Sequence, residues 1–149
     1  AVDAGRLVTR VLAAEPVVAQ SVRLLAVGKA AGPMARAAVE VLGSRVQGGL
    51  VVVPGAEAVP PGLDVVGAEH PQPGNGSEEA GRRALQLSAA VRADEELLVL
   101  LSGGASSLLA APVPGVTLAD KRRTTGVLLR AGADIVALNT VRKHLSRVK

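Results

Sequence analysis

"LLVLLSGGASSLLAAP", residues 97–112, contains the sharpest change of character in the chain. Its apolar beginning is typical of a strand buried in a sheet, and the apolar run ends at Ser102. Two glycines and a pair of serines then expose backbone amides and hydroxyls before leucines return. Three interpretations are open: a turn without further purpose, a serine nucleophile, or a cradle for an anion such as a phosphate.

Strand-like and helix-like segments alternate on both sides of this stretch. Short runs of Val and Leu between Gly and Pro predict strands, and helical periodicity with capping residues predicts helices. The predicted strands are 23–28, 48–55, 63–71 and 95–104; the predicted helices are 2–14, 33–43, 77–91, 117–131 and 134–149. This alternation predicts an α/β fold, a three-layer Rossmann-like domain with a mainly parallel sheet.

The helix ends carry their own signals. Pro33 lies near a first turn and Gly43 at a C-terminus, Ser77 is expected to open a helix, and "TLAD" (117–120) is typical of a capping box. The last helix is expected to place Ile135, Leu138, Val141, Leu145 and Val148 on one side. It runs to Lys149 without a stop signal, so we expect a fragment of a longer protein.

Composition limits the classes of function. The chain has 149 residues, 48% of them hydrophobic, with no Cys, Phe, Trp or Tyr. No apolar run is long enough for a bilayer and no signal-peptide pattern is present, so we expect a cytoplasmic protein that binds no membrane. The net charge of +4 suits phosphate-bearing ligands. Nucleic acid is not expected, because no aromatic residue can stack on bases.

Four common site types lack their motifs. The phosphate-binding P-loop motif GxxxxGK[ST] is missing. Gly28-Lys29 matches its GK, but Arg23 stands at the position of the first glycine and Ala30 at the position of the Ser or Thr. The dinucleotide pattern GxGxxG is missing, and Ser106 lacks the closing glycine of a GxSxG elbow. Two histidines without cysteine cannot form a dedicated zinc site. We therefore expect no metal ligands in the chain, and Mg²⁺ only as carried by a nucleotide.

The anion cradle remains the favoured interpretation of residues 102–107. Gly103 and Gly104 allow backbone amides to approach a ligand, and Ser102, Ser106 and Ser107 add hydroxyls. "GKAAGP" (28–33) and "HPQPGNG" (70–76) also follow predicted strands, so the three loops are expected at the same edge of the sheet. Of the basic clusters, "DKRR" (120–123) is interpreted as a solvated helix face. Arg142 and Lys149 would either reach a phosphate or offset a helix dipole.

"AVGKAAGPMA", "EHPQP" and the whole of residues 97–149 resemble the glycerate 2-kinases of the class that carries a MOFRL domain. The resemblance implies that residues 1–149 are the N-terminal Rossmann-like part of a two-domain kinase whose C-terminal MOFRL domain is absent here. It also implies ATP-dependent phosphorylation of D-glycerate to 2-phosphoglycerate with Mg²⁺, in a cleft between the two domains. On that basis the 149-residue chain alone is expected to be inactive.

The resemblance implies roles for individual residues. Lys29 of the GKAA motif would be catalytic. The ligand-binding residues would be Gly28, Ser102, Gly103, Gly104, Ser106, Ser107, Asn139, Arg142 and Lys149, with His70, Lys143 and Ser146 as further candidates. Ala105 stands where the family commonly has a third glycine, and residues 74–76 where many relatives have an acid. These departures put the exact shape of two loops in doubt, but not Lys29.

Other functions and arrangements stay open. A hydroxypyruvate reductase is a second enzymatic hypothesis, and the missing GxGxxG argues against it. A sugar-phosphate-binding module without chemistry is a third. The expected partners are D-glycerate and the nucleotide, and a homodimer is one arrangement open to the protein.

Overall fold

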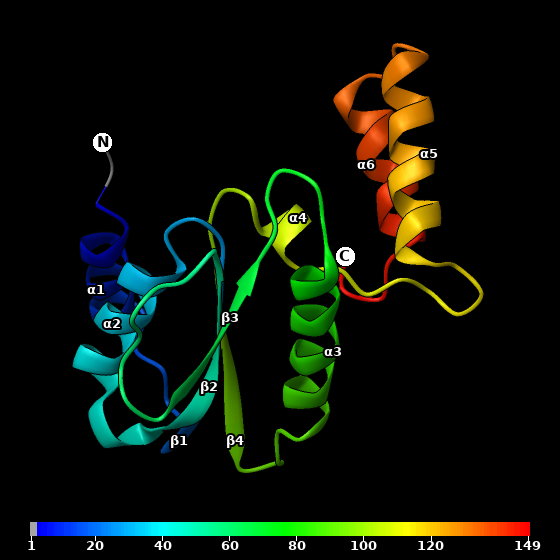
Figure 1. The fold of residues 1–149 in the computed structure, drawn as a ribbon. Helices are drawn as coiled ribbons and strands as arrows, with labels where there is room; N and C mark the ends of the chain where they lie inside the picture. The colour runs from blue at the N-terminus through cyan, green and yellow to red at the C-terminus, as the bar shows by residue number, and fades with distance from the viewer. Residues whose placement is uncertain (1–2) are drawn as a thin grey trace.

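Four parallel strands form the central sheet, in the order β3-β2-β1-β4 (Figure 1). A computed structural model describes residues 3–149, so the predicted start of the first helix at Val2 lies outside the described residues. The strands are β1 (Ser21–Val27), β2 (Val46–Pro54), β3 (Leu63–Ala68) and β4 (Glu95–Leu101). The predicted α/β class and parallel sheet are confirmed.

Helices cover both faces of the sheet and make three layers. The helices are α1 (Ala4–Ala14), α2 (Ala31–Leu42), the 3₁₀ turn η1 (Gly43–Arg45), α3 (Asn75–Ala89), α4 (Ala105–Leu108), α5 (Leu118–Arg130) and α6 (Ile135–His144). One apolar core joins α1 and α2 to the side chains of one sheet face, among them Leu24 and Val51. A second core joins α3 and α4 to the other face, around Val27 and Val52. Both cores are built without aromatic side chains, as the composition requires.

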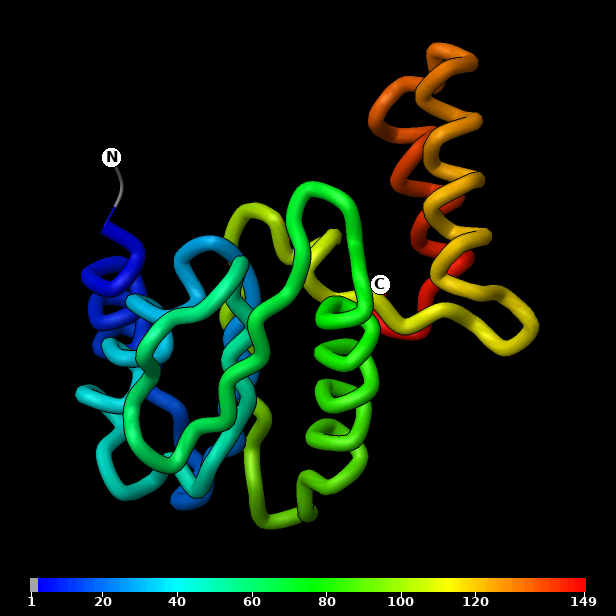
Figure 2. Tube along the Cα trace, viewed as in Figure 1, coloured from blue at the N-terminus to red at the C-terminus, as the bar shows by residue number. Residues whose placement is uncertain are grey.

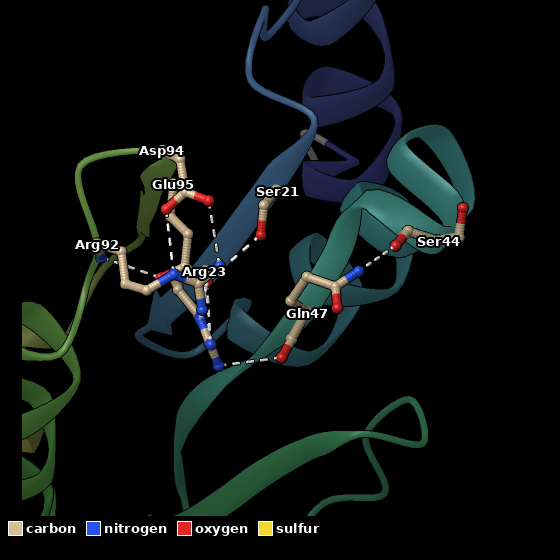
Figure 3. A network of polar contacts seen from close by, with 7 residues as sticks. All are labelled: Ser21, Arg23, Ser44, Gln47, Arg92, Asp94 and Glu95. Carbon is tan, nitrogen blue, oxygen red and sulfur yellow. Dashed lines mark hydrogen bonds and ion pairs between the residues drawn. The ribbon is translucent and has the colours of Figure 1, made fainter.

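A polar network at the amino ends of β1 and β4 fixes how these strands pair (Figure 3). The side chain of Glu95 is fully shielded and accepts from Arg23 Nε at 3.0 Å and from the backbone N–H of Arg92 at 3.0 Å. These donors hold the pKa of Glu95 below its ordinary value. The register begins with Ser21 beside Glu95 and ends with Val27 beside Leu101. The two strands therefore finish side by side at the opposite edge, where the predicted site lies.

Helices α5 and α6 form a hairpin that projects away from the sheet (Figure 2). The predicted capping box is confirmed, since Thr117 Oγ1 accepts from the N–H of Asp120 at 3.0 Å. Asp134, where the last helix was expected to begin, caps α6 by accepting from the N–H of Ala137 through Oδ1 at 2.8 Å. The chain then returns to the domain, where Ser146 bridges to Pro112 and the N–H of Arg147 donates to Ala111 O at 2.9 Å.

Three details of the sequence analysis are corrected. The last helix ends at His144, because the following residues pair with the segment before α5, so Val148 does not extend its apolar side. Strand β4 is not fully buried, since it lies at the sheet edge and leaves 43% of Val99 and 64% of Leu101 exposed. Helix α3 begins at Asn75, which places Ser77 inside the first turn instead of at its cap.

Candidate functional site

The loops after β1 and β4 are in direct contact. The N–H of Lys29 donates to Gly103 O at 2.9 Å, and the N–H of Ser102 donates to Val27 O at 2.9 Å. Both loops leave the carboxyl edge of a parallel sheet, which is where ligands bind in open α/β folds. The loop of the predicted anion cradle and the loop that carries Lys29, both expected at this edge, therefore lie together.

Gly28 and Ser102 form the tightest point between these loops. Gly28 has a φ of +128°, and a Cβ on it would lie 2.1 Å from Ser102 Oγ. The same Oγ accepts from the N–H of Ala30 at 3.0 Å and lies 3.4 Å from Val27 O. Its hydroxyl thus ties the loops together, and the donors left for a ligand are on the backbone.

The amides of Gly103 and Gly104 are the free donors at this point. Within residues 3–149 neither amide has a hydrogen-bond partner. Gly104 has a φ of +90°, and a Cβ there would lie 3.0 Å from the imidazole of His70 and 3.5 Å from Lys29 Cγ. The side chains of Lys29 and His70 therefore flank the glycine turn, with Lys29 exposed to solvent. An exposed ammonium beside unpaired amides suits a negatively charged oxygen.

Carboxylates lie at the N-termini of the two longer helices at this edge, and the one at α3 accepts hydrogen bonds from the helix amides. Glu57 lies against Gly32 in the first turn of α2, where it pairs with Arg36 at 3.0 Å. Glu69 accepts from the N–H groups of Gly76 at 3.2 Å and Ser77 at 3.0 Å, which begin α3. Desolvation works to raise the pKa of Glu69, but these hydrogen bonds outweigh it and the pKa lies below the ordinary 4.5. The amide of Gly76 in the loop "HPQPGNG" is therefore already bound by Glu69.

Replacing Glu69 by alanine should lower the free energy of unfolding at pH 7 by about 0.5–2 kcal/mol, the usual effect of losing a helix cap. Because the folded-state pKa lies below 4.5, the stabilisation is present above that pH and is lost as pH falls through the lowered pKa. The deficit should therefore shrink in acid, as measured by urea unfolding between pH 7 and 3. Glu40→Ala, at an exposed position on α2, is the control. An equal deficit at both pH values would contradict the capping role.

A second group of predicted residues gathers at α4. Arg142 Nη2 donates to Ser106 Oγ at 2.7 Å, and Lys149 Nζ donates to Ser106 O at 2.5 Å. Asn139 Oδ1 lies 3.4 Å from Arg142 Nη1, one turn earlier on α6. The structure thus brings Ser106, Asn139, Arg142 and Lys149 together.

Three other predicted residues do not contact this group through the hydrogen bonds described. Ser107 is buried and its Oγ donates to Gly104 O at 3.0 Å, so it supports the glycine turn from inside. Ser146 is buried in the bridge to Pro112. Lys143 is exposed on α6. Their roles in ligand binding stay predictions.

A cavity of about 360 Å³ lies between the α5–α6 hairpin and the domain. It is lined by Pro71, Gln72, Pro73, Ser106, Ala110, Lys121, Arg122, Thr125, Gly126, Leu129, Leu138, Arg142, Leu145 and Lys149. Its volume falls within the roughly 300–1,000 Å³ typical of ligand pockets. Four of the lining side chains are cationic and none is a carboxylate.

Lys121 is the residue that the sequence analysis missed. The prediction that the "DKRR" cluster is a solvated helix face is wrong for Lys121, which is 6% exposed. Its Nζ is shielded and has no hydrogen-bond partner in residues 3–149. Burial and the charge of Arg142 lower the pKa of Lys121, and Glu78 partly opposes them. Its spacing of three from buried Leu118 was the signal that it lies on the inner face of its helix.

Burial and neighbouring positive charges also act on the pKa of Lys149. Desolvation of its ammonium group, with the positive charges of Lys121 and Arg142, lowers the pKa of Lys149 to about 8. The cavity therefore holds positive charges that oppose one another and have no carboxylate among its lining residues to balance them.

Metal-ligating residues do not cluster in the described part of the chain. Between residues 3 and 149, no group of three or more His, Asp or Glu side chains is placed to hold an ion. No helix in that range is both long and apolar enough to cross a membrane.

Comparison with known proteins identifies relatives along the whole chain. The family model described as "Domain of unknown function (DUF4147)" matches residues 1–149. The D-glycerate 2-kinase of Thermotoga maritima is 44% identical over 128 residues, covering 85% of this chain and 31% of the relative. Human glycerate kinase is 40% identical over 145 residues, covering 87% of this chain and 28% of the relative. A protein from Agrobacterium vitis named as a candidate hydroxypyruvate reductase is 41% identical over 128 residues, covering 85% and 33%.

A solved structure is similar in fold as well. The crystal structure of Thermotoga maritima glycerate kinase superposes with a TM-score of 0.93 at 41% identity, covering 99% of this chain and 36% of that one. The chain spans about a third of the length of these relatives.

Proposed function

Since the chain belongs to the DUF4147 family, we propose that it is the N-terminal Rossmann-like part of a D-glycerate 2-kinase. The full-length protein would phosphorylate D-glycerate with ATP to give 2-phosphoglycerate, in the cytoplasm. A C-terminal MOFRL domain would complete the active site in the cleft between the two domains. Support comes from relatives named glycerate kinase in bacteria and in mammals.

The observation that carries the proposal is the contact between the Lys29 and Gly103 loops. Phosphoryl transfer needs alignment of the reactants and neutralisation of spread negative charge more than it needs covalent chemistry. An exposed ammonium and two unpaired amides, at Lys29, Gly103 and Gly104, supply that combination. Oxygens of the substrates are the natural ligands for such a group.

The residues present fit a nucleotide with its metal ion. The unpaired amides and the cationic cavity suit phosphate oxygens, and a nucleotide would carry its Mg²⁺ ion into the site. When bound, ATP with Mg²⁺ supplies the phosphoryl group that is transferred.

The chain's own residues would bind the reacting groups, balance their charge and hold the loops in position. Lys29 would hold a substrate oxygen and balance the negative charge that develops on the phosphoryl group. Gly103 and Gly104 would donate hydrogen bonds to an oxyanion without reorganising. His70 would limit the space above Gly104, and Ser102 would keep the two loops in register.

A reductase acting on hydroxypyruvate is the second candidate, because the name of the Agrobacterium vitis relative points to it. A nicotinamide cofactor is expected to need a GxGxxG turn after a strand, and the sequence has none. The kinase is therefore favoured.

Two assays on the full-length protein separate these functions. With D-glycerate, ATP and Mg²⁺ we expect formation of ADP and 2-phosphoglycerate, whereas with hydroxypyruvate and NADH we expect no loss of NADH absorbance. Oxidation of NADH without phosphoryl transfer would contradict the proposal. The 149-residue chain alone should turn over neither pair, and measurable kinase activity from it would contradict a cleft completed by a second domain.

A further inference from the structure

The cavity under the α5–α6 hairpin is built like a site for a highly charged anion. Lys121, Arg122, Arg142 and Lys149 line it, and no carboxylate does. Arg122 donates through Nε to Pro73 O at 2.5 Å, and Arg142 and Lys149 are held by Ser106. Three of the four cations are thus fixed in place by the protein without being neutralised by it.

Lys121 distinguishes this cavity from an ordinary basic surface. It is 6% exposed, and its Nζ has no hydrogen-bond partner among residues 3–149. Leaving an ammonium buried and unpaired is unfavourable, so such groups are expected to have a partner. Glu78 is near enough to act on its charge, but it forms no ion pair with Lys121 within the described residues.

We infer that Lys121, Arg142 and Lys149 bind a phosphoryl group of a ligand in this cavity. The number of cations decides between the two substrates. D-Glycerate has a single negative charge, whereas a polyphosphate or phosphate monoester presents two or more, which matches several cations held close together. The inference rests on the proposed function for the source of that group: the nucleotide or the product 2-phosphoglycerate.

Lys121→Met tests the inference because it removes the charge and keeps most of the apolar length. In the full-length protein, calorimetric titration at pH 7 should show the Kd of ADP, of 2-phosphoglycerate or of both rising about tenfold or more, the usual effect of losing a charged hydrogen bond. The Kd of D-glycerate should stay unchanged. The midpoint of thermal unfolding should not fall, because an unpaired buried charge has been removed.

Arg123→Met is the matched control. Arg123 lies two residues further along α5, its side chain is 75% exposed, and it does not line the cavity. We expect it to leave all three dissociation constants unchanged. Loss of ADP affinity alone identifies the nucleotide as the ligand, and loss of 2-phosphoglycerate affinity alone identifies the product; either supports the inference.

Three results would overturn it. One is unchanged affinity of Lys121→Met for both phosphorylated ligands; another is weakening confined to D-glycerate. The third is a Lys121→Met protein that is less stable or fails to fold, which would make Lys121 a structural partner of Glu78. None of these depends on turnover. A protein without kinase activity whose ADP affinity still falls on Lys121→Met would refute the proposed function and keep the phosphoryl site.

Discussion

Lys29→Ala in the full-length protein should lower kcat for D-glycerate phosphorylation by about 10²–10³-fold, the range seen when one pre-organised charge or donor at the reacting group is removed. Lys29 lies on the loop that contacts Gly103, and its side chain flanks the free amides. Its loss would leave two neutral donors to balance a phosphoryl group that carries several charges. Steady-state kinetics with a coupled ADP assay measures the effect.

Two variants make the Lys29 experiment specific. Lys29→Arg keeps the positive charge but replaces a compact ammonium by a planar fork, so we expect it to recover only part of the activity. Arg10→Ala removes a charge from an exposed position on α1 and should leave kcat unchanged. Circular dichroism of each variant checks that the fold is retained. A folded Lys29→Ala protein with nearly wild-type kcat would exclude Lys29 from the reaction.

Gly28→Ala should have the largest effect on stability. Two separate penalties act at this position: φ is +128°, which side chains rarely adopt, and the new Cβ would lie 2.1 Å from Ser102 Oγ and 2.7 Å from Ser102 O. Backbone strain and overpacking each cost about 1–3 kcal/mol, so the free energy of unfolding should fall by about 2–6 kcal/mol. Urea denaturation followed by circular dichroism measures it.

Gly103→Ala is the matched control for Gly28→Ala. Gly103 lies in the facing loop, its φ is outside the left-handed region, and no atom lies within 4 Å of the position of its Cβ. We expect its free energy of unfolding to change by less than about 0.5–1 kcal/mol. Equal losses for both variants would show that the two loops are not packed as described.

The sheet and its helices could be predicted from local patterns because each is determined by neighbouring residues. Continuous apolar runs occur where both sheet faces are covered, as for residues 24–27 of β1 and 50–53 of β2. The capping box at Thr117 and the end of α2 at Gly43 depend on residues within four positions of each helix end. The position of the Lys29 and Gly103 loops at one edge also followed, since parallel strands end together, whereas their direct contact depends on β1 and β4 being neighbours.

The features that sequence reasoning missed depend on contacts between distant segments. The spacing from Leu118 places Lys121 on the inner face of α5, but nothing near "DKRR" shows that residues 71–73 and Lys149 line one cavity with it. The last helix ends where Ser146 pairs with Pro112, and the whole α5–α6 hairpin separates these two residues in the sequence. The exposure of β4 follows from its place at the sheet edge, and strand order is not a local property.

A crystal structure of the full-length protein with D-glycerate and a non-hydrolysable ATP analogue tests the central claim most directly. We predict a ligand oxygen about 3 Å from Lys29 Nζ, with the same group accepting from the amides of Gly103 or Gly104. Both ligands bound away from these loops, with Lys29 in solvent, would contradict the account.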